Sequence, residues 1–283
     1  MNLNLDWLAQ VFPTISSLQP IGRGGQKIVF SGNHNRDGKV VLKLFHIFVD
    51  PERAIREVQA VQDIGSARVP KILEVGTTNA PFGDVMWVRE QYVPGEDLRN
   101  ILSRGKLKRN AILLLALQVL EVLAAAEKAG ITHRDVKPEN IRVDQNGNCW
   151  LLDFGIARHL RKESLTATAD TFGLGTPGYA PPEQFRNRKP DIDARSDLFA
   201  LGVTLYECAE GNNPFISEAR DVGEVLRRVE TVPLPPISRN IEETGAFRDL
   251  VLAMTRTKLD HRLPTAAEGY LWIKEICSKE ALG

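Results

Sequence analysis

Residues 133–140 bring together the side chains that transfer of a phosphoryl group requires. The sequence there reads His-Arg-Asp-Val-Lys-Pro-Glu-Asn, and Asp153 follows thirteen residues after Asn140. Asp135 can accept and orient the proton of a substrate hydroxyl, and Lys137 can neutralise a phosphoryl group in transit. Asn140 and Asp153 carry the oxygen ligands that Mg²⁺ bound to ATP prefers. The stretch therefore predicts phosphoryl transfer from Mg-ATP.

A further lysine, Lys43, lies inside an apolar run that predicts a strand. Lys43 ends the run Val-Val-Leu-Lys, and in the helical segment that follows, Ala54, Glu57, Val61 and Ile64 recur on one face. A carboxylate in an apolar stripe is costly unless it has a partner. We therefore expect Lys43 to pair with Glu57. The alternative is an edge lysine whose side chain points into solvent.

A glycine-rich turn lies between two expected strands. Residues 21–30 read Ile-Gly-Arg-Gly-Gly-Gln-Lys-Ile-Val-Phe. Glycines let a backbone approach and cover phosphates, and Val29 can pack on a flat base. The turn precedes a strand and not a helix, which argues against a Rossmann dinucleotide site.

Together these segments resemble the Hanks-type (eukaryotic-like) protein kinases. The same family order continues in Gly-Thr-Pro-Gly-Tyr-Ala-Pro-Pro-Glu at residues 175–183, Asp-Leu-Phe-Ala-Leu-Gly at 197–202, and Leu-Asp-His-Arg-Leu-Pro-Thr at 259–265. The resemblance covers about residues 17–280, and the style of the sequence resembles bacterial members. Lys137 and the Gly-Thr pair before Pro177 resemble the serine/threonine branch.

The resemblance implies a role for each matching residue. The implied catalytic residues are Asp135, Lys137, Lys43 and Glu57; the implied nucleotide-binding residues are Ile21, Gly22, Gly24, Gly25, Val29, Val41, Lys43, Gln91, Val93 and Asn140; the implied metal ligands are Asn140 and Asp153. The implied cofactors are ATP and Mg²⁺, with Mn²⁺ as an alternative. Implied structural contacts are Glu183 with Arg262, Asp197 with the backbone of the 133–140 loop, Thr176 with Asp135 and Lys137, and a packed His133.

Three residues depart from the family pattern. Lys27 stands where the third glycine is usual, Glu90 where the gatekeeper is usually apolar, and Arg142 where a leucine usually lies under the adenine. A charge at the last two positions is expensive unless it is solvated or paired. Arg142 could lay its stem under the base and turn its head to solvent. Glu90 could instead reflect a one-residue slip in the alignment.

The expected fold is α+β, the bilobal protein-kinase fold. Residues 1–16 form a helical lead-in, residues 17–91 a small antiparallel-sheet lobe with one helix, and residues 92–283 the hinge and a mainly helical lobe, as one kinase domain overall. Expected strands lie at 18–21, 28–31, 39–45, 72–76, 85–92, 141–144 and 149–153, and expected helices at 5–12, 50–64, 108–128, 197–210, 247–255 and 266–278.

Composition and charge limit the partners and the location that we expect for the chain. Lys+Arg 36 balance Asp+Glu 36, so no net charge would gather nucleic acid or an anionic membrane. The apolar stretch at residues 111–126 is too short and too polar for a membrane span. Cys149, Cys208 and Cys277 match no metal spacing and are expected to be reduced core residues. With no signal peptide indicated, the expected location is cytoplasmic.

The function that the sequence indicates is ATP-dependent phosphorylation of serine or threonine on a protein. Arg134 is placed to dock a phosphorylated loop, and Ser164, Thr166, Thr168 and Thr171 are candidate autophosphorylation sites, with Thr166 and Thr168 favoured. The alternatives are a pseudokinase that binds partners without turnover and a small-molecule kinase. The substrate, the activating signal, the oligomeric state and whether the chain is a whole protein or an excised domain cannot be read from the sequence.

Overall fold

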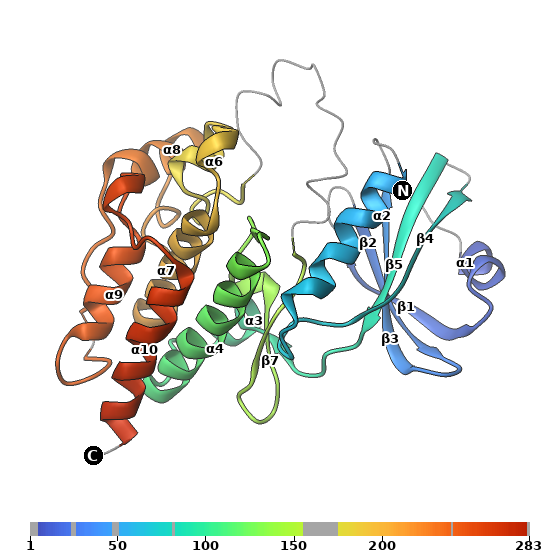
Figure 1. The fold of residues 1–283 in the computed structure, drawn as a ribbon, viewed down its shortest axis with the longest axis horizontal. Coiled ribbons are helices and arrows are strands. Elements are labelled where there is room, and N and C mark those ends of the chain that lie inside the picture. Colours follow the sequence, from blue (N-terminus) through green and yellow to red (C-terminus); the bar gives the residue numbers. More distant parts are fainter. Residues whose placement is uncertain are drawn as a thin grey trace. The chain divides into compact units, whose positions relative to one another are not determined.

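The computed structural model describes residues 5–23, 27–46, 51–80, 83–154, 175–238 and 240–281. The chain forms two compact units, whose elements are labelled in Figure 1. The first contains the described residues up to Asp63 together with Pro70–Val93. The second contains Ile64–Val69 and the described residues from Pro94 onward.

The first unit is a five-stranded antiparallel sheet with two helices. Its elements are α1 (Leu5–Val11), β1 (Ile15–Arg23), β2 (Lys27–His34), β3 (Gly38–His46), α2 (Pro51–Ala60), β4 (Ile72–Ala80) and β5 (Gly83–Gln91). The strand order is β1-β2-β3-β5-β4, and every neighbouring pair is antiparallel. The expected antiparallel-sheet lobe is confirmed.

The N-terminal helix α1 packs on one face of this sheet. Alternate residues of β2 and β3 form a buried apolar layer, because side chains two positions apart in a strand share a face. Leu8 in α1 and Phe12 just after it pack into this layer. The ring of Phe12 meets the ring of Trp87 edge-on, with 5.4 Å between the ring centroids. The lead-in segment that the sequence separates from the lobe therefore contributes to the lobe's core.

Helix α2 packs against β4 in the same unit. The sequence predicts a helix to about residue 64, and the α-helix ends at Ala60 and continues as a 3₁₀ turn, η1 (Val61–Ile64). Gly65 follows with φ +64°, a left-handed conformation that glycine adopts at little cost. Its position explains why the helix stops there.

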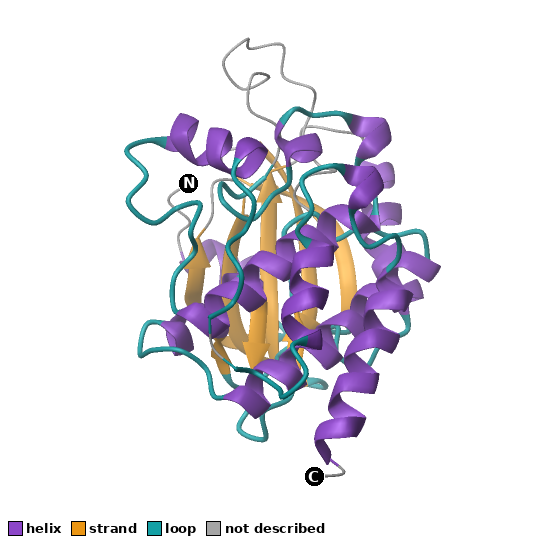
Figure 2. Cartoon of the chain, turned by 90° about the vertical axis from the view of Figure 1, so that its left-hand side faces the viewer, coloured by secondary structure: helices purple, strands orange, loops and turns teal. Residues whose placement is uncertain are grey.

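The second unit is mainly helical, as expected, and Figure 2 shows its helices in purple. Its elements are β6 (Glu96–Asp97), α3 (Leu98–Leu102), α4 (Arg109–Lys128), η2 (Pro138–Asn140), β7 (Ile141–Val143), β8 (Cys149–Leu151), α6 (Pro182–Phe185), η3 (Lys189–Asp191), α7 (Ala194–Glu210), α8 (Val222–Thr231), α9 (Ala246–Met254), η4 (Leu259–His261) and α10 (Ala266–Ala281). The strands pair in the order β6-β7-β8. Sequence analysis did not predict β6, α3 or α8.

Helices α4 and α7 form the interior of this unit. Helix α4 is long and apolar enough to cross a membrane by length and composition, but more than half of its most apolar stretch is buried, where it packs against α7 and α10. It is therefore a core helix, as the sequence predicts. Helix α7 begins at the cap Asp193 and ends at Gly211, which has φ +87°.

Candidate active site

One buried carboxylate holds the backbone of the 133–140 loop. Asp197, in the first turn of α7, is 2% exposed. Its Oδ2 accepts a hydrogen bond from the backbone N–H of His133 at 2.7 Å, and its Oδ1 accepts one from the N–H of Arg134 at 2.6 Å. Arg134 has φ +65°, which is costly for a residue other than glycine. Asp197 thus stabilises the loop conformation, and the predicted contact is confirmed.

His133 is a structural residue, as predicted. Its ring is buried and meets Phe154 edge-on, with 4.5 Å between the ring centroids. Nε2 lies 2.8 Å from the carbonyl oxygen of Leu152, and Nδ1 accepts the N–H of Asp135 at 3.2 Å. Because a carbonyl can only accept, the proton lies on Nε2 and the imidazole is neutral. His133 therefore fixes the start of the loop.

Four side chains converge where the hydroxyl chemistry was predicted. Thr176 donates its hydroxyl to Oδ1 of Asp135 at 2.8 Å and accepts a hydrogen bond from Nζ of Lys137 at 2.7 Å. Lys137 also lies 3.0 Å from Oδ2 of Asp135. Asn140 donates from Nδ2 to the Asp135 carboxylate at 3.0 Å and to its carbonyl oxygen at 2.7 Å. The structure thus brings together Asp135, Lys137, Asn140 and Thr176.

The two predicted metal ligands, Asn140 and Asp153, lie on segments that a backbone hydrogen bond joins. The N–H of Leu152 donates to the carbonyl oxygen of Asn140 at 2.8 Å, and Asp153 is the next residue. Because Nδ2 of Asn140 is committed to Asp135, the atom through which Asn140 can ligate a metal is Oδ1. An amide oxygen and a carboxylate suit Mg²⁺, which takes its other ligands from phosphates and water. The donor set fits the predicted ion.

The first unit contains a buried ion pair that sequence analysis did not predict. Nζ of Lys43 donates to both carboxylate oxygens of Glu90, at 2.6 and 2.7 Å, and both residues are 5% exposed. Lys43 lies opposite Val88 in the β3–β5 register, and Glu90 lies opposite Val41. The two side chains are therefore diagonal neighbours on one face of the sheet.

This pair gives Lys43 a partner other than the expected Glu57. Glu57 lies in α2, but its side chain is outside the described part of the structure, so its pairing with Lys43 stays a prediction. Glu90 is a partner that the resemblance does not supply. Glu90, which the resemblance places at the gatekeeper position, is paired within the sheet, and its alignment with that position stays a prediction.

Several predicted nucleotide-binding residues share the face of Lys43. Val29 lies directly opposite Lys43 in the β2–β3 register, and Val41 is two positions away on the same strand. Gly22 pairs with Val29 across β1 and β2, and Ile21 is exposed beside it at an irregularity of the pairing. Gly24 and Gly25 lie outside the described residues. The valines and Lys43 thus form one surface.

The segment predicted as the hinge follows β5 directly. The N–H of Gln91 donates to the carbonyl oxygen of Lys71 at 2.9 Å, which ties the end of β5 to the residue before β4. Val93 is buried. Contacts of Gln91 and Val93 with a nucleotide stay a prediction.

Arg142 is paired and not free in solvent. Its Nη1 donates to Oδ1 of Asp97 at 3.0 Å, and its Nη2 donates to the carbonyl oxygen of Gly95 at 2.6 Å. Gly95 has φ +114°, and a Cβ there would lie 2.2 Å from the carbonyl oxygen of Val143. Burial raises the pKa of Asp97, and the charge of Arg142 opposes that shift. Arg142 therefore braces the β6–β7 junction.

The pair implied for the end of the 175–183 segment is confirmed. Arg262 Nη1 donates to Oε1 of Glu183 at 2.6 Å, and both side chains are buried. The guanidinium also lies over the ring of Phe199, 5.0 Å from its centroid. Ser196 donates its hydroxyl to the same carboxylate at 3.0 Å. Glu183 thus ties the segment to α7 and to the loop before α10.

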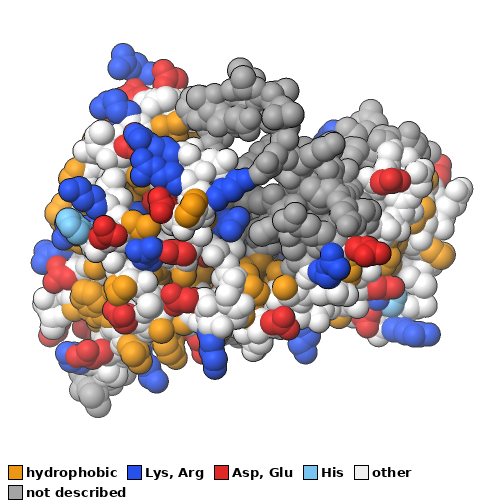
Figure 3. Space-filling model, turned by 45° about the horizontal axis from the view of Figure 1, so that its top comes forward, with side chains coloured by type: hydrophobic (Ala, Val, Ile, Leu, Met, Phe, Trp, Pro, Cys, Tyr) orange, Lys and Arg blue, Asp and Glu red, His pale blue; other side chains and the backbone are white. Residues whose placement is uncertain are grey.

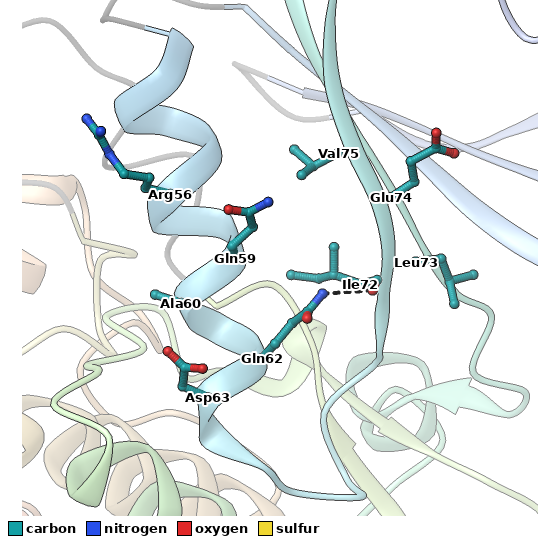
Figure 4. Close-up of a pocket in the computed structure, with 9 residues that line it drawn as sticks. All are labelled: Arg56, Gln59, Ala60, Gln62, Asp63, Ile72, Leu73, Glu74 and Val75. Carbon is teal, nitrogen blue, oxygen red and sulfur yellow. Dashed lines mark hydrogen bonds between the residues drawn. The ribbon is translucent and has the colours of Figure 1, made fainter.

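The first unit also contains a pocket of about 610 Å³ (Figure 4). It is bounded by α2, η1 and β4, and Gln62 spans it by donating to the carbonyl oxygen of Ile72 at 2.9 Å. Among the predicted catalytic residues whose side chains the structure describes, Lys43, Asp135 and Lys137 do not line it. On the face drawn in Figure 3, basic and acidic side chains of the described residues are interspersed.

Comparison with known proteins places the chain in a family. The model of the protein kinase domain matches residues 15–271, which is most of the chain. The chain therefore belongs to the protein kinase domain family, with the bilobal fold that the sequence predicts. The curated relatives described below are bacterial serine/threonine kinases, so the chain groups with the bacterial Hanks-type serine/threonine kinases.

Three of these relatives illustrate the similarity. A probable serine/threonine-protein kinase of Streptomyces coelicolor is 31% identical over 93% of this chain and 40% of its own length. The serine/threonine-protein kinase PknB of Mycolicibacterium smegmatis is 34% identical over 75% of this chain and 34% of its own length. The serine/threonine-protein kinase pkn3 of Myxococcus xanthus is 34% identical over 92% and 49%. The chain spans less than half the length of these relatives.

Proposed function

We propose that this chain transfers the γ-phosphate of Mg-ATP to serine or threonine hydroxyls of a protein. The observation that carries the proposal is the contact of one Asp135 carboxylate with Lys137, Asn140 and Thr176. The names of the relatives support the same reaction and the same class of acceptor. A cytoplasmic location stays a prediction.

Each residue of the site has a defined task in this reaction. Asp135 accepts the hydrogen bond of the substrate hydroxyl and orients its oxygen for attack, while Thr176 and Asn140 keep the carboxylate in place. Lys137 supplies positive charge beside the oxygen that attacks. When bound, Mg-ATP supplies the phosphoryl group and the metal charge that offsets its oxygens. Oδ1 of Asn140 and the Asp153 carboxylate would hold the metal.

Autophosphorylation is the finer part of the proposal. The candidate sites Ser164, Thr166, Thr168 and Thr171 lie outside the described residues. Within the described part of the chain, Nε of Arg134 is buried and has no hydrogen-bond partner. A phosphate on that segment would give the guanidinium charge-assisted hydrogen bonds.

The direct test follows intact mass. The chain is first treated with a phosphatase and then incubated with Mg-ATP, beside Asp135→Asn and Asp153→Ala variants. We expect added phosphate on the wild type and a loss of roughly a hundredfold or more in rate for Asp135→Asn. Peptide mapping then shows which hydroxyls are modified. Equal phosphate incorporation in all three proteins would refute the assigned roles.

A pseudokinase is the second candidate, and one contact favours it. Glu90 engages Lys43 with both oxygens, so part of the positive charge expected to meet the phosphates is already neutralised. Calorimetry separates the two candidates. Mg-ATP binding without phosphate transfer to itself or to any serine- or threonine-containing peptide of a degenerate library would favour the pseudokinase.

A further inference from the structure

We propose that Glu90 is a positioning residue that sets the affinity of the chain for nucleotide phosphates by acting as the resident counter-ion of Lys43. The inference rests on the proposed function, in which Lys43 receives those phosphates. It differs from the pairing with Glu57 that the family resemblance implies, because its carboxylate comes from the sheet itself.

The contact is built into the sheet register. Lys43 opposes Val88 and Glu90 opposes Val41, so the pair sits on one face of the antiparallel β3–β5 ladder. Neither side chain needs a loop or a helix to reach the other. Both oxygens of Glu90 accept from the same Nζ, at 2.6 and 2.7 Å. The ammonium is therefore fixed by rigid backbone on both sides.

The surroundings make the pair strong. Val88 and Met86 on β5 share this face and are fully buried, and Lys43 and Glu90 are each 5% exposed. In such a poorly solvated place, charges act on each other far more strongly than in water. A buried carboxylate beside a lysine stays ionised only because the lysine compensates it. Glu90 and Lys43 therefore offset each other's charge on this face.

A polyphosphate that approaches Lys43 meets both charges. Its oxygens are attracted by the ammonium and repelled by the carboxylate, and Lys43 must share its three N–H donors between Glu90 and a phosphate. Neutralising Glu90 without changing its shape removes the repulsion and frees donors. The affinity for the phosphate-bearing part of a nucleotide should then rise, while the affinity for the nucleoside part should not change.

The test is calorimetric titration of the full chain with Mg-ADP, Mg-ATP and adenosine. Three variants accompany the wild type: Glu90→Gln, which keeps the shape and removes the charge; Lys43→Met with Glu90→Gln, which removes both charges; and Glu74→Gln. Glu74 pairs with Arg89 on the opposite face of the same sheet, so it controls for loss of one negative charge.

We expect Glu90→Gln to bind Mg-ADP and Mg-ATP roughly tenfold more tightly than the wild type, with adenosine unchanged. The gain should be absent in Lys43→Met with Glu90→Gln and in Glu74→Gln. Equal or weaker Mg-ADP binding by Glu90→Gln, or an equal change for adenosine, would overturn the inference.

Two further readouts keep the test decisive. Thermal unfolding in the absence of nucleotide checks that Glu90→Gln is folded, and Glu90→Asp, which keeps the charge, should bind Mg-ADP with the wild-type affinity. If Glu90→Asp matches Glu90→Gln instead, the effect is one of packing and the inference fails. Because binding is measured directly, a chain that binds nucleotide but transfers no phosphate would overturn the proposed reaction and leave this inference intact.

Discussion

Arg99 on α3 and Glu207 on α7 form a salt bridge of 2.6 Å that joins the start of the second unit to its central helix. Arg99 also donates from Nε to Glu139 at 2.7 Å, and Tyr179 contacts both Arg99 and Glu207. Burial alone would lower the pKa of Arg99, but its hydrogen bonds to Glu207 and Glu139 raise it above its ordinary value. One guanidinium thus serves two carboxylates beside the 133–140 loop.

Replacing Arg99 by alanine should destabilise the chain, because it leaves the buried Glu207 carboxylate without its cation. We expect a loss of about 2 kcal/mol in the free energy of unfolding, since Arg99 itself is partly solvated. Urea unfolding measures the loss. Guanidinium ion at low concentration should then raise the melting temperature of Arg99→Ala and not that of the wild type, because it refills the vacated site.

Arg104 offers a matched control for this prediction. It forms a salt bridge of the same length, 2.6 Å, with Glu96, but the side chains of both Arg104 and Glu96 are exposed. Arg104→Ala should change the free energy of unfolding far less than Arg99→Ala does, because solvent screens an exposed pair. Equal effects of the two substitutions would show that burial of Glu207 does not decide the outcome.

Thr176 should matter for turnover through its hydroxyl. The side chain links Asp135 and Lys137 by one donated and one accepted hydrogen bond. Thr176→Val keeps the shape and removes both bonds, so we expect kcat to fall roughly tenfold to a hundredfold with a smaller change in KM for ATP. Thr176→Ser should retain most of the activity. Steady-state kinetics with a peptide substrate gives both constants, and a Thr176→Val enzyme with wild-type kcat would contradict the assignment.

The sequence predicted those parts of the site that are encoded by contiguous residues. The chemistry of these parts could be inferred from the residue types of single segments, as for residues 133–140, Asp153 and Asp197. Glu183 with Arg262 could also be predicted, because family order supplies a contact that local spacing cannot. The strands and long helices followed from periodicity of apolar residues, and α8 was missed because its amphipathic pattern follows an irregular loop.

The Lys43–Glu90 pair could not be predicted from local pattern, because it depends on strand register. The sequence shows Glu90 between Arg89 and Gln91, just after the apolar run at residues 85–88, and a charge that is buried at such a place needs a partner. It does not show which strand supplies that partner. Sequence analysis gave Lys43 the partner Glu57, and only the β3–β5 register places Glu90 diagonally beside it. The signal to look for is a carboxylate on the neighbouring strand, two residues along from the residue that lies opposite the lysine.

Removing Arg142 should make stability more dependent on pH through Asp97. The pKa of Asp97 is raised by burial, and Arg142 opposes this shift. A raised pKa means that the folded chain holds this proton more tightly than the unfolded chain, so the stability contributed by Asp97 decreases as pH rises through the folded pKa. In Arg142→Leu the pKa of Asp97 rises further, so the destabilisation should be larger at about pH 7.5 than at about pH 4.5.

Urea unfolding at the two pH values tests this prediction, and the carboxyl chemical shift of Asp97 reports its pKa directly. Asp97→Asn combined with Arg142→Leu is the control, because it has no carboxyl group to titrate and should lose the pH difference. A destabilisation of Arg142→Leu that is the same at both pH values would contradict the coupling. Nucleotide titration of Arg142→Leu tests in addition whether a leucine there preserves affinity, as the family pattern implies.

The Glu183–Arg262 pair should be among the costliest contacts in the second unit to break. Both side chains are buried, so Arg262→Ala leaves a carboxylate with no cation beside it. We expect a loss of about 3–5 kcal/mol in the free energy of unfolding, measured by urea denaturation. Arg262→Lys should not restore it, because one ammonium cannot stack on Phe199 as the planar guanidinium does and cannot also reach the carbonyl oxygens of Arg195 and Arg256, to which the guanidinium donates.

Two comparisons decide whether this loss comes from the uncompensated charge. Arg186 pairs with Glu230 at 2.5 Å in a more exposed setting, so Arg186→Ala should destabilise the chain far less than Arg262→Ala. Glu183→Gln combined with Arg262→Met removes both charges and should be more stable than Arg262→Ala alone, because no buried charge is then left without a partner. If the double variant is as unstable as Arg262→Ala, the loss arises from packing of the guanidinium against Phe199 and not from the carboxylate that it leaves behind.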